Sequence, residues 1–223
     1  MNNIMKRLQQ VRNLAIKIEP GIKPNISDWK SFSTDSILPF IFLLPYSDIE
    51  VEDKHMEIAA AFLFLQISQN CHAKVVDENS SDNYTAILYG DLFYSHAYKI
   101  LESKDSKESL TEIAKVMVKI NESWFYHQDL ENKANPTLEE FAPAIHNELG
   151  LLMDLAASKS WEDAKKPKEL QSSYQECTAK IALLWGARMH RYPLNFAKTK
   201  NEILNLATTI NFQDEIKIIT DNL

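Results

Sequence analysis

Apolar residues recur every three or four positions along almost the whole chain, whereas strand-like alternation between turn signals is scarce. Side chains at this spacing share one face of an α-helix. A helix with such a face buries it against other helices. The sequence therefore predicts an all-α fold, built as a helical bundle.

Turn and cap signals divide the pattern into separate helices. Pro20-Gly21 ends the first one, and acidic residues from Asp48 to Asp53 lie at the start of a long helix, where negative charge complements the helix dipole. A polar break is expected from Trp161 to Ser173. The expected helices span residues 4–18, from about 28 or 35 to 45, about 48–76, 85–101, 110–127, 138–157, 174–189 and 198–210.

Size and composition indicate one domain over residues 1–223, because 45% of the residues are hydrophobic and no linker interrupts them. The net charge of −7 argues against a broad nucleic-acid surface, which needs clustered positive charge. Four scattered glycines exclude the glycine-rich loops that bind nucleotide phosphates.

The longest apolar runs, Ile37 to Pro45 and Ile58 to Leu65, are too short to span a membrane, and no signal peptide opens the chain. Two cysteines, Cys71 and Cys177, sit within apolar helical patterns. They are expected to be buried, reduced thiols, as is usual in the cytoplasm. The sequence therefore predicts a cytoplasmic protein with no transmembrane segment.

Two neighbouring stretches carry the most specific signal. The first ends in His72-Ala73-Lys74-Val75-Val76-Asp77, and the second contains Tyr89-Gly90-Asp91-Leu92-Phe93. Positions 73 and 77 lie four apart, on one face of a helix, so two carboxylates there could share a metal ion. Here Ala73 removes that pair, and an ammonium group at Lys74 repels a cation. We expect no metal at these positions, because magnesium needs hard oxygen ligands.

These stretches resemble the trans-isoprenyl diphosphate synthases, in which the first motif reads His-Asp-Asp-x-x-Asp and the second reads Ala-Gly-Asp. The sequence is most similar to the small subunit, component I, of the heterodimeric heptaprenyl and hexaprenyl diphosphate synthases, which also lacks the aspartate-rich motifs. The Asp48-Ile49-Glu50 turn and Ile120-Asn121-Glu122 add to this likeness. No Asp-Asp dipeptide occurs anywhere in the 223 residues.

The resemblance implies a bundle of the isoprenoid-synthase type and a non-catalytic subunit that docks on a large subunit bearing both aspartate motifs. It implies that this chain binds no cofactor and that Mg²⁺ sits on the partner. The subunit would help set the length of a C30–C35 polyprenyl tail for a quinone such as menaquinone. A homodimer is expected when the partner is absent. The degenerate motif positions are His72, Ala73, Lys74 and Asp77, and the candidate tunnel or interface residues are Phe62, Gly90, Asp91, Phe93 and Glu122.

Three other functions deserve comparison. An all-α assembly chaperone for redox enzymes fits the size and acidity but leaves the Gly90-Asp91 segment unexplained. An enzyme of the haem-oxygenase-like group with a thiol nucleophile needs a cysteine of depressed pKa. A di-iron site would draw on Glu122, His127, His146 and Glu148, but such sites need Glu-x-x-His on two helices, and this pattern occurs once, from Glu52 to His55.

Overall fold

The computed structural model describes residues 3–25, 34–73, 81–104, 107–133 and 135–223. Every regular element in these ranges is a helix, which confirms the all-α prediction. Within the same ranges, no helix has both the length and the apolar character needed to cross a bilayer. Two compact units, Met1–Leu110 and Thr111–Leu223, divide the chain, and each is described by itself. The single-domain assignment stays a prediction.

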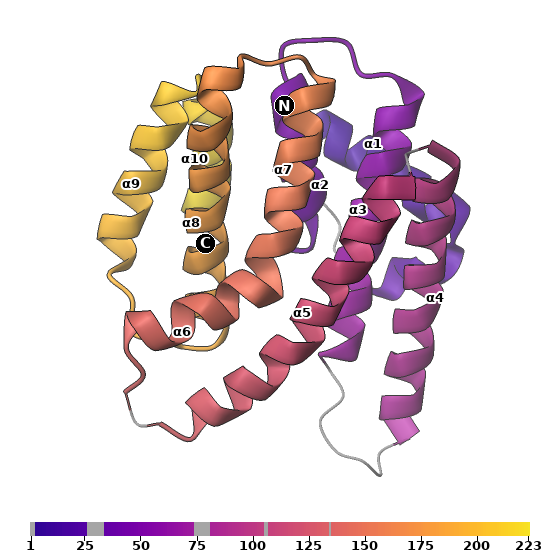
Figure 1. The fold of residues 1–223 in the computed structure, drawn as a ribbon. Coiled ribbons are helices and arrows are strands. Elements are labelled where there is room, and N and C mark those ends of the chain that lie inside the picture. Colours follow the sequence, from indigo (N-terminus) through magenta and orange to yellow (C-terminus); the bar gives the residue numbers. More distant parts are fainter. Residues whose placement is uncertain (1–2, 26–33, 74–80, 105–106, 134) are drawn as a thin grey trace. The chain divides into compact units, whose positions relative to one another are not determined.

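The described residues of the first unit form four α-helices, with short 3₁₀ turns at Pro20–Asn25, Thr34–Ser36 and Leu44–Tyr46 (Figure 1). The sequence located α1 correctly, and α2 begins at the later of its two expected starts. Helix α3 begins at Asp53, the last of the acidic residues that the sequence placed at its start. The four helices are α1 (Asn3–Ile18), α2 (Ile37–Leu43), α3 (Asp53–His72) and α4 (Ser81–Lys104).

Helix α3 is the centre of the first unit and packs against α1, α2 and, along much of its length, α4. Residues 58 to 68 are buried without interruption, so this part of the helix has no solvent face. A helix that is apolar all round is buried on all sides. Its start is held by Glu52 and His55, which form a reciprocal capping box.

In the second unit, the described residues form most of α5 (Lys107–Glu131), which begins just before the division, and five further α-helices. Helix α8 packs against α6, α7 and α9, and α10 packs against α9. The sequence prediction missed α10, whose short amphipathic pattern buries Ile216 and Ile219. The five helices are α6 (Leu138–Ile145), α7 (Leu151–Asp163), α8 (Gln171–Met189), α9 (Phe196–Thr209) and α10 (Gln213–Asn222).

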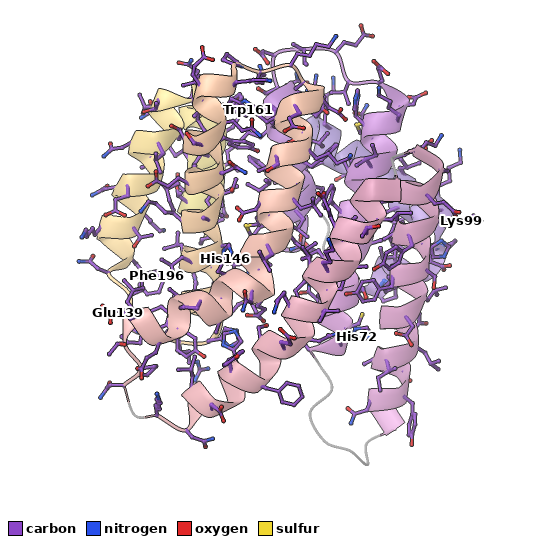
Figure 2. All side chains as sticks on the ribbon, in the orientation of Figure 1. His72, Lys99, Glu139, His146, Trp161 and Phe196 are labelled. Carbon is purple, nitrogen blue, oxygen red and sulfur yellow. The ribbon has the colours of Figure 1, made fainter. Side chains whose placement is uncertain are left out.

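A bend separates α6 from α7, where the sequence predicted one continuous helix (Figure 1). The residues His146–Gly150 form one π-helical turn, and Pro143 lies just before it within α6. Proline and π-turns both interrupt the regular ladder of hydrogen bonds and so bend helices. Figure 2 marks His146 at this bend.

The prediction of a polar break starting at Trp161 is wrong, because α7 continues to Asp163. Trp161 is only 1% exposed, and its ring lies 4.9 Å from that of Tyr174 at the start of α8. Its indole N–H donates a hydrogen bond of 2.9 Å to the carbonyl of Pro167, in the connection between the helices. The indole therefore connects α7 to α8, the two helices on either side of the predicted break.

Candidate functional site

The degenerate aspartate motif begins at the end of α3. His72 is the last residue of the helix and Ala73 is its C-cap, whereas Lys74 and Asp77 lie outside the described residues. The His72 side chain is largely buried, and its Nε2 lies 3.4 Å from Asp91 Oδ1 on α4. The ring also packs 5.7 Å from that of Tyr94. His72 thus contacts two residues of α4, the helix that carries the second motif.

Gly90 lies where α3 and α4 approach each other closely. The Ser68 hydroxyl donates a buried hydrogen bond of 2.7 Å to the Gly90 carbonyl. A Cβ added at Gly90 would lie 2.1 Å from His72 Nε2 and 2.3 Å from its Cδ2, far inside van der Waals contact. Glycine is therefore needed here because the His72 imidazole occupies the space of a side chain.

Replacing Gly90 by alanine is expected to destabilise the protein by about 1 kcal/mol, because His72 must swing away from α4 and overpacking is costly. In a His72→Ala background the same change should instead stabilise by up to about 1 kcal/mol, since alanine favours helices over glycine. Urea unfolding of the four proteins measures the coupling. A His96→Ala background is the matched control, because His96 pairs with Glu19 and should leave the cost of Gly90→Ala unchanged. Equal effects in all backgrounds would contradict the packing argument.

The candidate tunnel residues Phe62 and Phe93 are both buried in the core of the first unit. The Phe62 ring lies 5.3 Å from Phe42, and the Phe93 ring lies 5.7 Å from Tyr89. A role in lining a polyprenyl tunnel stays a prediction. Glu122 lies on the exposed face of α5 in the other unit and forms an ion pair of 2.8 Å with Lys119.

The outer face of α4 exposes large apolar side chains that the sequence interpretation did not single out. Tyr84 and Leu88 are 68% and 69% exposed. Residues four apart lie one above the other on a helix, so Tyr84, Leu88 and Leu92 form a stripe. Ile87 and Tyr89 widen it. This α4 stripe, the five residues named here, lies on the same helix as Gly90 and Asp91.

Both cysteines are buried, as expected. Burial raises the pKa of the Cys177 thiol to about 12, so it stays protonated at neutral pH. A nucleophilic cysteine needs the opposite shift. Cys177 therefore does not support the alternative of an enzyme with a thiol nucleophile.

A second group of polar side chains, in the second unit, was only partly foreseen. His127 and Glu148, two of the four residues considered for di-iron binding, lie together with His190. Glu122 pairs with Lys119, and His146 is exposed and does not belong to this group. A di-iron site is thus not formed by those four residues. His190 follows the last turn of α8, and no sequence spacing links it to the other two.

Comparisons with known proteins bear on the fold. No protein-family model matches the sequence, and no curated protein matches it either. The solved heptaprenyl diphosphate synthase from Staphylococcus aureus superimposes with a TM-score of 0.64 at 15% identity, over 98% of this chain and 77% of that one. The chain has the isoprenyl diphosphate synthase fold. This confirms the predicted bundle, whereas identity at this level carries no residue roles.

Two further structures share the isoprenyl diphosphate synthase fold. A decaprenyl diphosphate synthase from Rhodobacter capsulatus gives a TM-score of 0.61 at 15% identity, over 82% of this chain and 64% of that one. This chain therefore spans less than two thirds of that synthase. A deletion mutant of the heterotetrameric geranyl pyrophosphate synthase from mint gives 0.61 at 12% identity, over 95% of this chain and 98% of that one.

Proposed function

We propose that this protein is the non-catalytic subunit of a two-component trans-prenyl diphosphate synthase that makes C30–C35 products for quinone side chains such as that of menaquinone. The observation that carries the proposal is the α4 stripe on an isoprenyl diphosphate synthase fold. In the proposed complex this face docks on a catalytic large subunit in the cytoplasm. The same face can pair two copies when the partner is absent.

The residues at the end of α3 favour an accessory role over catalysis. In the resembling synthases, aspartates there hold the magnesium that binds the allylic diphosphate. Here Ala73 offers no ligand, and Asp91 on α4 faces an imidazole at 3.4 Å. Magnesium prefers several oxygen ligands in octahedral geometry. Ionisation of the allylic substrate and attack by isopentenyl diphosphate are therefore assigned to the partner, whose Mg²⁺ stabilises the departing diphosphate.

The α4 stripe has the chemistry of a protein interface. Tyrosine and leucine side chains supply apolar area, and the tyrosine hydroxyl groups can form hydrogen bonds at the polar rim of an interface. Exposed apolar side chains that gather on one helix face, instead of being scattered singly, are typical of interaction surfaces. The mint structure supports the proposal, because a chain of nearly the same extent belongs to a heterotetrameric prenyl synthase.

The proposed subunit acts on product length through its apolar interior. A growing polyprenyl tail needs an apolar cavity, and a helical partner can complete one without catalytic residues. Phe93 lies on the α4 helix one residue after Leu92 of the stripe, and its ring is fully buried. Replacing Phe93 by leucine is expected to lengthen the product made by the complex of this chain and the large subunit, because a smaller side chain leaves more room for the tail.

Prenyl transfer with magnesium, farnesyl diphosphate and labelled isopentenyl diphosphate tests the proposal. The assay compares this chain alone, a large subunit bearing both aspartate motifs alone, and the two mixed. Long-chain product only in the mixture is the expected result. Turnover by this chain alone would contradict the proposal that Ala73 leaves it without catalytic magnesium. If this chain has no effect on an active large subunit, the assembly-chaperone alternative is favoured.

Replacing Leu88 by glutamate is expected to weaken binding to the large subunit at least about 30-fold, because a charge is buried in an apolar contact. Long-chain product should fall in parallel, while circular dichroism stays unchanged because Leu88 is exposed. Leu138→Glu is the matched control, since Leu138 is an exposed leucine at the start of α6 and not part of the α4 stripe. Equal losses in both variants would place the interface elsewhere.

A further inference from the structure

A buried cluster of two histidines and one glutamate lies in the second unit. One Glu148 oxygen, Oε2, lies 3.0 Å from His127 Nε2 and 2.9 Å from His190 Nε2. The three ligand-type atoms lie within 4.8 Å of one another. His127 and Glu148 are buried, and the His190 side chain is 17% exposed. The cluster, named here the His-Glu-His site, thus has His190 as its most exposed side chain.

Three separate segments build the His-Glu-His site. His127 comes from the last turns of α5, and Glu148 comes from the π-turn between α6 and α7. His190 is the C-cap of α8, where Arg191 takes a left-handed φ of 57°. The Tyr192 N–H then bonds back to the Ala187 carbonyl at 2.8 Å, which closes a Schellman motif. This motif fixes the backbone of His190 and Tyr192 beside the cluster.

Tyr192 orients His127. Its hydroxyl lies 2.8 Å from His127 Nδ1, and the two rings stack at 5.9 Å. Among the described residues, His127 Nε2 has no hydrogen-bond partner, although it is buried and lies beside Glu148. When Nδ1–H donates to the tyrosine oxygen, the lone pair of Nε2 is available to a metal ion. Metal-binding histidines are commonly held by such a bond to the other ring nitrogen.

The carboxyl group of Glu148 is buried and faces a ring nitrogen of both histidines. Carboxylate oxygen and imidazole nitrogen atoms that converge in this way are metal ligands. Burying a carboxylate is costly unless it is paired or coordinates a metal. A cation bound between the three side chains would compensate its charge.

We propose that His127 Nε2, Glu148 and His190 Nε2 bind one divalent transition-metal ion of the zinc class, with a fourth position open to solvent beside His190. Two imidazoles and one carboxylate are a common ligand set for zinc with an open position. Ligand atoms around a tetrahedral zinc lie about 3.3 Å apart, close to the observed contacts. This site is separate from the magnesium chemistry proposed for the partner, since imidazole suits zinc, nickel and copper and magnesium prefers oxygen.

Binding requires one ring to move. The His127 and His190 rings are stacked with centroids 4.0 Å apart and an angle of 6° between their planes. Lone pairs of parallel rings do not converge on one point, so one imidazole tilts when the ion binds. His190 is the ring that tilts, because it lies at a helix end and borders solvent, whereas Tyr192 holds His127.

Zinc titration of the chelator-treated full-length protein, followed by calorimetry, tests the proposal. One equivalent of Zn²⁺ should bind, Mg²⁺ at the same concentration should not, and Co²⁺ should give visible d–d absorption of a low-symmetry site. His190→Gln, the mildest change because that side chain borders solvent, should weaken Zn²⁺ binding more than about 100-fold, beyond the usual effect of a residue that only supports a ligand. Tyr192→Phe should weaken it about tenfold.

His146→Asn is the matched control, because His146 lies on the same π-turn but outside the His-Glu-His site. This variant should bind Zn²⁺ as the wild type does. Glu148→Gln provides a second ligand variant of equal size, and near-ultraviolet circular dichroism checks that each variant is folded. Absence of Zn²⁺ binding, or binding unchanged in His190→Gln, would overturn the proposal. Neither outcome affects the prenyl-transfer test.

Discussion

Replacing Trp161 by alanine is expected to lower the free energy of unfolding by about 3–5 kcal/mol, the usual cost of truncating a fully buried tryptophan. The indole packs on Tyr174 and meets Phe212 edge-on at 6.2 Å, so its loss leaves a cavity between α7, α8 and the start of α10. Its hydrogen bond to the Pro167 carbonyl is lost as well. Urea unfolding followed by circular dichroism measures the change.

Trp161→Phe separates the two contributions to this effect. Phenylalanine keeps much of the apolar contact but cannot donate the hydrogen bond, which contributes about 1 kcal/mol. This variant should therefore lose less stability than Trp161→Ala. Phe125→Ala serves as the control, because Phe125 is 71% exposed and should change stability by no more than about 0.5 kcal/mol. A Trp161→Ala effect as small as the control would contradict the packing described for the second unit.

Replacing Gly186 by alanine is expected to destabilise the protein by about 1–3 kcal/mol through overpacking. A Cβ at this position would lie 2.6 Å from Ile145 Cγ2 and 2.9 Å from its Cγ1, and Ile145 is buried where α6 meets α8. The gain of about 1 kcal/mol that alanine brings to a helix offsets only part of this cost. Thermal and urea unfolding measure the net loss.

A double-mutant cycle with Ile145→Ala tests the cause. The single Ile145→Ala change should cost about 2–5 kcal/mol by leaving a cavity. Combined with Gly186→Ala, the new methyl group enters that space, so the double variant should be more stable than the sum of the two single effects predicts. Additive effects would show that the two positions do not share the contact.

The all-α class and the position of most helices could be predicted from apolar periodicity, because the residues that each helix buries recur every three or four positions. The misses have local causes. Trp161 stands among polar residues, so its burial depends on Tyr174 and Phe212, which come from other elements. Helix α10 has only ten residues, and a pattern this short gives little periodic signal.

The candidate site was predictable in part. The motif residues His72, Gly90 and Asp91 do lie together, because the spacing along α3 and α4 places them on facing sides. The apolar face formed by Tyr84, Leu88 and Leu92 was not foreseen, since periodicity alone does not say which of two apolar faces is buried. His190 joined the buried polar cluster through tertiary packing, for which no spacing in one sequence gives a signal.

The π-turn at His146–Gly150 has a consequence for how this chain tolerates insertions and deletions. One extra residue in a helical turn rotates every later side chain by about 100° relative to an uninterrupted helix. Glu148, Leu149 and Gly150 within this turn are consecutive and all buried. Removing a single residue here would send the α7 apolar face toward water, so the length of this segment, more than its composition, is what natural variants must preserve.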